Sequence, residues 1–185
     1  SVTVATGPFA RFGPLTVDGL HNVDASYVYR IAEWQSGTVY DIREIERVRR
    51  TLSQTRLFNT ITPPPPPGDV TVEADDLVPV TFEVGEGKQH SIGVGAFYST
   101  DEEGLGGSVS WENRNLFGSA ERLRIRLEGS QIQQTGEIDF RKPAFYRLNQ
   151  SLLATVAVDT NDTDAYKGIT GSGSIALART FAKYC

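Results

Sequence analysis

Residue types that commonly perform catalysis are scarce in this chain, which has two histidines and one cysteine among 185 residues. His90 and Ser91 are adjacent in a segment expected to be a strand, so their side chains point to opposite faces and cannot form a nucleophilic pair. Cys185 has no second cysteine to bind, and the spacing of Cys and His matches no metal site. The sequence therefore predicts no metal, no cofactor and no activated nucleophile.

Glu137 and Asp139 fall on one face of an expected strand, where two carboxylates could act as acid and base. An ion pair with Arg124 or Arg126 is the favoured interpretation, because structural ion pairs are common. Two glycine-rich stretches lack the spacing and the following helix of a phosphate-binding loop. They are residues 85–88 and 104–107. We therefore expect a protein that is not an enzyme.

Composition narrows the class further. The net charge is −5 and 39% of residues are apolar, without the basic patch of a nucleic-acid-binding protein. No apolar stretch is long enough for a transmembrane helix, although strands that cross a bilayer would escape a hydropathy search. The chain has no Met, and its last residues are still strand-like. We expect a piece of a longer, processed protein.

The hydrophobic period changes in mid-sequence. From His90 onward the chain alternates as strands do, and residues 122–128 place arginines and a glutamate on one face and leucines and an isoleucine on the other. The expected strands are 90–99, 105–113, 121–131, 134–141, 151–160 and 169–181. Turns are expected at 101–104, 115–120 and 143–149, with a longer polar loop at 161–167.

An apolar outer face and a polar inner face are typical of strands in a membrane β-barrel. The expected lipid-facing residues are Ile92, Val94, Ala96, Tyr98, Val109, Trp111, Leu123, Ile125, Leu127, Ile138, Phe140, Leu152, Ala154, Val156 and Val158. The expected lumen residues are Ser108, Ser110, Glu112, Arg122, Arg124, Arg126, Glu137, Asp139 and Arg141. The period alone also fits a soluble sandwich whose core is the apolar face.

Before about Glu86 the chain reads as a small mixed domain in the order strand, helix, helix, strand, strand. Asp24 is the expected N-cap of the first helix, and Asp41 with Glu44 forms a capping-box pattern for the second. The second helix should bury Ile42, Ile45, Val48 and Leu52 and expose its arginines. Strands are expected at Phe58–Thr62 and 78–84, with Pro79 at a sheet edge or a strand beginning, and prolines 63–67 should form an extended loop that could dock a proline-binding domain.

That element order resembles a POTRA (polypeptide-transport-associated) domain over residues 12–86. The resemblance is carried by Val17-Asp18-Gly19-Leu20, Tyr40-Asp41, Leu52, Leu57-Phe58 and the strand 78–86. The second segment is similar to the first barrel strands of TamA-like outer-membrane assembly proteins. It is carried by residues 93–101, by the turn motif Arg114, Asn115, Leu116, Phe117, Gly118, and by residues 139–143 and 159–166.

The resemblance implies an α+β POTRA domain at 1–88 and, at 89–185, the first six antiparallel strands of an incomplete barrel. A complete member of this POTRA-plus-barrel (BamA/TamA) superfamily resembles several POTRA repeats followed by a sixteen-stranded barrel. The chain therefore looks like a fragment with the last POTRA domain and the first barrel strands. The localisation implied is the bacterial outer membrane, with the POTRA domain in the periplasm.

The implied function is assembly or translocation of β-barrel and autotransporter proteins. Unfolded client proteins, outer-membrane lipid and a TamB-like periplasmic or inner-membrane subunit are the implied partners. Clients could add to the POTRA edge strand, formed by Phe58, Asn59, Thr60, Ile61 and Thr62. The candidate gate strand is Ile92, Gly93, Val94, Gly95, Ala96, Phe97 and Tyr98.

Glycine weakens a strand, but Gly93 and Gly95 could equally let a neighbouring strand pack closely. The alternatives for the whole chain are a two-partner-type secretion transporter and a soluble β-sandwich binding module. An enzyme with carboxylates at a barrel mouth is the third.

Overall fold

The structure is a computed structural model that describes residues 10–65, 77–99, 104–163 and 166–181. The chain divides into two compact units, Ser1–Gly87 and Lys88–Cys185. Within the described residues, neither helix has the length and apolar character needed to cross a membrane.

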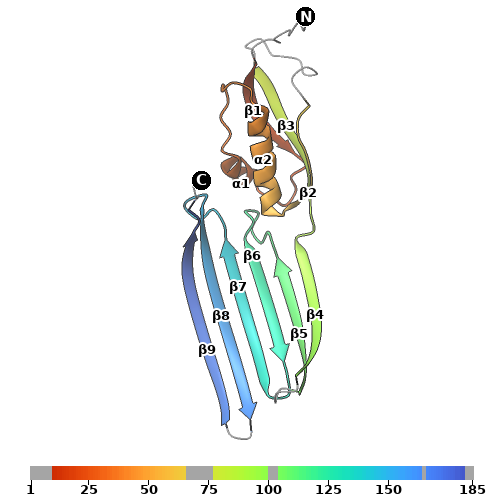
Figure 1. Cartoon of the computed structure of the whole chain (residues 1–185), viewed down its shortest axis with the longest axis vertical. Helices are drawn as coiled ribbons and strands as arrows, with labels where there is room; N and C mark the ends of the chain where they lie inside the picture. The colour runs from red at the N-terminus through yellow and green to blue at the C-terminus, as the bar shows by residue number, and fades with distance from the viewer. Residues whose placement is uncertain (1–9, 66–76, 100–103, 164–165, 182–185) are drawn as a thin grey trace, which may run out of the picture. The chain divides into compact units, whose positions relative to one another are not determined.

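The first unit is a three-stranded sheet with two helices (Figure 1). Its elements are β1 (Arg11–Asp18), α1 (Ala25–Ala32), α2 (Ile42–Thr55), β2 (Phe58–Thr62) and β3 (Leu77–Glu86). The strand order is β1-β3-β2, with β1 parallel and β2 antiparallel to β3. The expected order of strand, helix, helix, strand, strand is confirmed.

Both helices begin at the predicted caps. The Asp24 carboxylate accepts a hydrogen bond from the Ser26 N–H at 2.8 Å, and the Asp41 carboxylate accepts one from the Arg43 N–H at 2.9 Å. Glu44 does not complete the expected capping box, because its carboxylate binds the Arg47 side chain one turn further along α2.

One face of each helix and of β3 forms the core. Every second residue of β3 from Val78 to Val84 is buried, and Val48 and Leu52 of α2 are fully buried. Ile42 was expected in this core but is 58% exposed. It is the first residue of α2, and helical side chains lean toward the N-terminus, so Ile42 projects beyond the packed turns.

Pro79 lies in the central strand, so the edge position proposed for it is wrong, although it does lie near the beginning of β3. Opposite it the register of β1 shifts between Phe12 and Leu15. A Cβ on Gly13 would lie 3.1 Å from the Pro79 nitrogen, which shows how closely the two backbones approach. The bulge in β1 interrupts the ladder where Pro79 has no N–H to donate.

The second unit is one sheet of six antiparallel strands, each paired with its neighbours in sequence (Figure 1). The strands are β4 (His90–Ser99), β5 (Gly104–Asn113), β6 (Arg122–Gly129), β7 (Gln133–Lys142), β8 (Gln150–Thr163) and β9 (Tyr166–Arg179). All six expected strands are present. Among the residues of this unit that the structure describes, they form a single sheet, and not the two sheets that a sandwich would need.

The polar loop expected at 161–167 is wrong in part, because β8 and β9 continue into it. Asn161, Asp162 and Thr163 pair with Gly168, Lys167 and Tyr166. Backbone pairing does not require apolar side chains, and the Lys167 ammonium binds the Asp162 carboxylate across the extended hairpin. A prediction based on hydrophobic residues therefore placed the end of β8 too early and the beginning of β9 too late.

Candidate functional site

The six-stranded sheet has one polar and one apolar face, and the register shows which residues share each. On the polar face one continuous rung runs Ser91, Glu112, Arg124, Asp139, Thr155, Ser174. On the opposite face the adjacent rung runs Ile92, Trp111, Ile125, Ile138, Val156, Gly173. The expected division into a lipid-facing and a lumen-facing set therefore matches the two faces of this sheet.

The apolar face has no second layer in the part of the chain that the structure describes. Val94 is 81% exposed, Ile175 81% and Val109 50%, and these residues come from different strands of the sheet. Monomeric soluble proteins rarely expose so continuous an apolar surface. This surface requires an apolar environment or a covering partner.

Charged side chains border the apolar face at both ends of β8, one lysine at one end and an ion pair at the other. Lys142 lies level with Leu152, and the Asp162–Lys167 ion pair lies ten residues further along β8 on the same face. Ten residues of strand span about 34 Å, or about 26 Å of height at the 35–45° tilt of barrel strands. That height agrees with the apolar band of about 25 Å found on membrane barrels.

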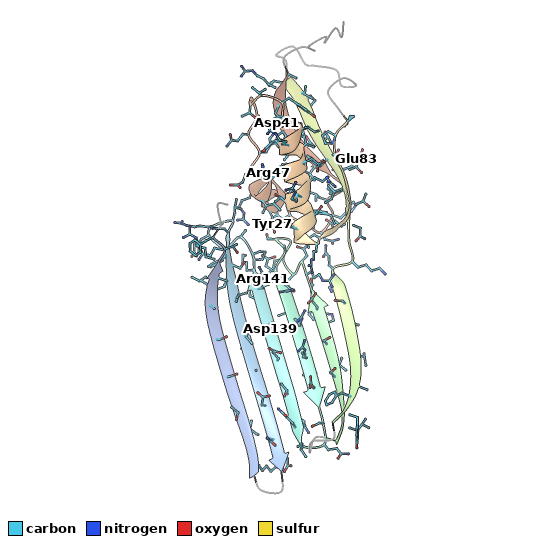
Figure 2. All side chains as sticks on the ribbon, in the orientation of Figure 1. Tyr27, Asp41, Arg47, Glu83, Asp139 and Arg141 are labelled. Atoms are coloured by element: carbon cyan, nitrogen blue, oxygen red, sulfur yellow. The ribbon has the colours of Figure 1, made fainter. Side chains whose placement is uncertain are left out.

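Ion pairs and hydrogen bonds cross the polar face, but with partners that differ from those expected. Arg124 binds Glu112 at 2.8 Å, and Glu112 also binds Arg114 at 2.7 Å. Asp139 accepts a hydrogen bond from the Thr155 hydroxyl at 2.8 Å (Asp139 is labelled in Figure 2). The expected pairing of Glu137 or Asp139 with Arg124 or Arg126 is therefore not found among the described residues.

The candidate gate strand, β4, is one edge of the six-stranded sheet. Its even-numbered residues Ile92, Val94, Ala96 and Tyr98 lie on the apolar face, and Gly93, Gly95 and Phe97 lie on the polar face. A Cβ on Gly93 would approach the Ser110 hydroxyl to 2.6 Å, and one on Gly95 would approach the Ser108 hydroxyl to 2.8 Å. The two glycines thus allow the serines of β5 to pack closely, and their role in gating stays a prediction.

The candidate partner edge, β2, is an edge of the three-stranded sheet, with Asn59, Thr60 and Thr62 exposed and Phe58 and Ile61 half-buried. The other edge is β1, which is already hydrogen-bonded to residues 37–40. The Phe12 N–H donates to the Thr38 carbonyl at 2.9 Å, and the Gly37 N–H donates to the Phe12 carbonyl at 2.7 Å. Whether β2 binds a partner stays a prediction.

The turn motif Arg114, Asn115, Leu116, Phe117, Gly118 forms the ordered connection between β5 and β6. The Asn115 side chain accepts from the Ala120 N–H at 3.1 Å, and the Leu116 N–H donates to the Glu121 carbonyl at 3.0 Å. Gly118 has φ 93° and Phe117 at the tip is 71% exposed. The segment therefore has a fixed shape with one aromatic ring projecting from it.

Sequence reasoning missed Glu121, which anchors this turn and is 1% exposed. Burial raises the pKa of Glu121, but hydrogen bonds from its own N–H and that of Ser119 and the Lys142 ammonium at 3.2 Å lower it more, so the net shift is downward. No local signal in the sequence indicates a contact with Lys142 on another strand.

Sequence reasoning also missed Glu86, at the end of β3. Its carboxylate accepts hydrogen bonds from the N–H groups of His21, Asn22 and Val23 at 2.8 to 3.0 Å. This carboxylate fixes the loop between β1 and α1 from a position more than 60 residues away in the chain.

No family model and no curated protein matches this chain. Among solved structures, BamA from Haemophilus ducreyi lacking POTRA domains 1-3 superimposes with a TM-score of 0.74 at 19% identity, over 88% of this chain and 31% of that one. CdiB from Acinetobacter baumannii superimposes with a TM-score of 0.58 at 11% identity, over 95% of this chain and 35% of that one.

These likenesses establish the fold. The second unit is only about half of the chain, so a match over 88% of it includes residues of both units. The chain spans about a third of the length of each of these structures.

Proposed function

We propose that this chain belongs to an outer-membrane protein that assembles or translocates other proteins, with no enzymatic activity of its own. The observation that carries the proposal is the continuous exposed apolar face, bordered by Lys142 at one end and by Asp162 and Lys167 at the other. Such a face suits acyl chains, and the polar face behind it suits water.

The fold likeness to BamA supports the assembly role that the sequence resemblance implies. In this proposal residues 1–88 are a POTRA domain in the periplasm and the six strands are the beginning of a barrel. An extended client segment adds to β2 through backbone hydrogen bonds, which make little demand on its sequence. The edge of β4 is then the place where the barrel opens to receive client strands.

The partners in this proposal are unfolded outer-membrane proteins, membrane lipid and a TamB-like subunit. A TamA-like rather than a BamA-like role rests on the resemblance of the turn motif at residues 114–118. A secretion transporter of the two-partner type is the second candidate, and the likeness to CdiB favours it. Identifying the proteins that become crosslinked to β2 in cells distinguishes many barrel clients from one dedicated secreted partner.

Neighbouring residues of β5 test the membrane placement. Val109 and Ser108 lie on opposite faces, and Val109 is already 50% exposed. If its face meets lipid, Val109→Arg costs about 2–4 kcal/mol of stability, because a guanidinium then enters the apolar band. The free energy of unfolding is measured by urea titration of the full protein folded into phospholipid vesicles.

Ser108→Arg is the matched control, since it places the same side chain one residue away on the polar face, opposite Glu128. It is expected to change the stability by less than about 1 kcal/mol. A water-exposed valine tolerates such a change within about 0.5 kcal/mol. Equal stability of the two variants would therefore refute the proposed contact with lipid.

A further inference from the structure

Three arginines lie level with one another at one end of the polar face. Arg122 of β6 and Arg141 of β7 are direct register partners (Arg141 is labelled in Figure 2). Arg114 directly follows β5, and continuation of the β5–β6 register places it level with Arg122 on the other side. We call Arg114, Arg122 and Arg141 the arginine rung.

The flanking side chains show that the rung belongs to the polar face. The Arg114 guanidinium binds Glu112 at 2.7 Å and donates to the Ser91 hydroxyl at 3.3 Å, and both partners belong to that face. The Arg141 guanidinium donates to the Ser151 hydroxyl at 3.4 Å. Arg122, as the partner of Arg141, shares the same side of the sheet.

The neighbouring carboxylates are already engaged. Glu112 uses one oxygen for Arg114 and the other for Arg124, which is two residues beyond Arg122 on β6. Asp139 accepts the Thr155 hydroxyl. No ion pair joins the Arg122 guanidinium to any other residue that the structure describes. Its register partner on β7 is Arg141, and the next residue of β6 on the same face is Arg124.

Like charges directly opposite each other on neighbouring strands destabilise a sheet, because the strands are only about 4.8 Å apart. Two rungs further along the sheet there is no such repulsion, because Arg126 of β6 is the register partner of Glu137 of β7. The arginine rung and the rung beside it, which contains Glu112, Arg124 and Asp139, together hold four arginines and two carboxylates. Their local excess of positive charge favours the binding of an anion at this place on the sheet.

We propose that the arginine rung binds an acidic polypeptide segment, one that presents at least two carboxylate side chains and passes over the polar face. A guanidinium fork matches a carboxylate in two parallel hydrogen bonds. Three forks on three strands extend over about 10 Å, more than one small anion can bridge. The inference goes beyond the proposed function, because it needs only the polar face and holds whatever meets the apolar one.

The hydroxyl groups beside the rung support a polypeptide as its ligand. Ser91 and Thr155 stand on the next rung, and Ser108 and Ser110 follow on β5. These groups can donate to and accept from the backbone of a bound segment. A free phosphate would use the arginines alone.

The test is binding of a fluorescent peptide in which three glutamates alternate with serines, measured by anisotropy with the full protein in detergent. Arg122→Gln and Arg141→Gln are each expected to weaken binding roughly tenfold, because each removes a charge-assisted fork. Arg126→Gln, on the same face but opposite Glu137, is the matched control and should bind as the parent does. A peptide with glutamine in place of glutamate should not bind.

Three outcomes would overturn the proposal. Equal weakening in Arg126→Gln would show a diffuse charge effect without a site. Displacement of the peptide by inorganic phosphate at equal concentration would show a small-anion site. Undiminished binding by Arg122→Lys, which keeps the charge and changes the fold least, would exclude recognition through the guanidinium fork. Circular dichroism confirms that each variant is folded.

Discussion

The Glu86 carboxylate joins two distant parts of the first unit, and its protonation state therefore affects the stability of that unit. Burial raises the pKa of its carboxyl, but hydrogen bonds from His21, Val23 and Asn22 lower it by more. The pKa of Glu86 in the folded protein is therefore below the usual value of 4.5. The charged form is therefore bound better in the folded unit than in the unfolded chain. This contribution to stability is present above about pH 4.5 and is lost as the pH falls through the lower pKa of the folded state.

Replacing this carboxylate tests whether charged Glu86 stabilises the first unit. Glu86→Gln is expected to destabilise the first unit by about 1–3 kcal/mol at neutral pH, because a charged acceptor of several N–H groups is lost. The variant should also lose part of the decline in stability at acid pH. Urea unfolding followed through Trp34, which packs on Phe12 with ring centroids 4.6 Å apart, measures both effects in a Trp111→Phe background.

Glu83 lies on the same strand and supplies the control (labelled in Figure 2). It is exposed, so Glu83→Gln should change the stability by less than about 0.5 kcal/mol. If both variants lose stability equally, the loop of residues 21–23 does not depend on Glu86.

At the scale of elements, the exposed residues of β2 are where an added client strand should be detected. A single cysteine at Thr60, in a Cys185→Ser background, is expected to form disulfides with cysteines placed along a client strand, because strand addition brings side chains to about 5 Å. Gel electrophoresis without reductant measures the adducts.

Gln54 near the end of α2 is exposed in the same unit and provides the control position. A cysteine there should form few adducts. Equal yields at the two positions would mean that β2 is not the docking edge.

The edge of β4 gives a second prediction at this scale. Gly93→Val strengthens the strand, and combining it with Ser110→Ala removes the hydroxyl that a Cβ on Gly93 would approach to 2.6 Å. If the outer edge of β4 must separate from the strand that closes the barrel, the double variant slows client insertion about fivefold, since strand propensities differ by about 1 kcal/mol. Insertion is timed by protease protection of a newly added client.

Gly136→Val is the control for that experiment, because it makes the same substitution in β7, which is not an edge of the sheet. A Cβ at this position lies 3.6 Å from the Leu127 side chain, which is an ordinary contact, and insertion should be as fast as in the parent. Unchanged insertion in the Gly93 double variant would leave close packing as the role of the glycine.

Whether a feature could be predicted from the sequence depends on how far apart in the chain the interacting residues are. The caps at Asp24 and Asp41 and the alternation of the six strands were predictable, because both depend on neighbouring residues. Pro79 in a central strand was not, because its tolerance depends on a bulge in a different strand. The charged partners expected on the polar face were wrong, because the register places Arg124 between Glu112 of β5 and Asp139 of β7. The Arg124 guanidinium binds Glu112, whereas Asp139 accepts a hydrogen bond from Thr155.

For the whole molecule, the strands β4 and β9 end the sheet without a further partner among the described residues, and unpaired strand edges do not persist in lipid. We expect the 185-residue chain alone, in detergent, to self-associate through these edges. Light scattering coupled to size exclusion measures the protein mass. A particle of one 20.3 kDa chain at all concentrations would contradict this expectation.

The hydrogen bonds between β1 and residues 37–40 have a consequence for growth of the small sheet. These hydrogen bonds cover the outer edge of β1 at residues 10–12, so a strand added at that end of β1 would have to displace residues 37–40. Under the proposed docking at β2, the two edges of the small sheet are therefore unequal. Successive addition of extended chains on both sides, the usual hazard of a sheet that recruits them, meets an obstacle at β1.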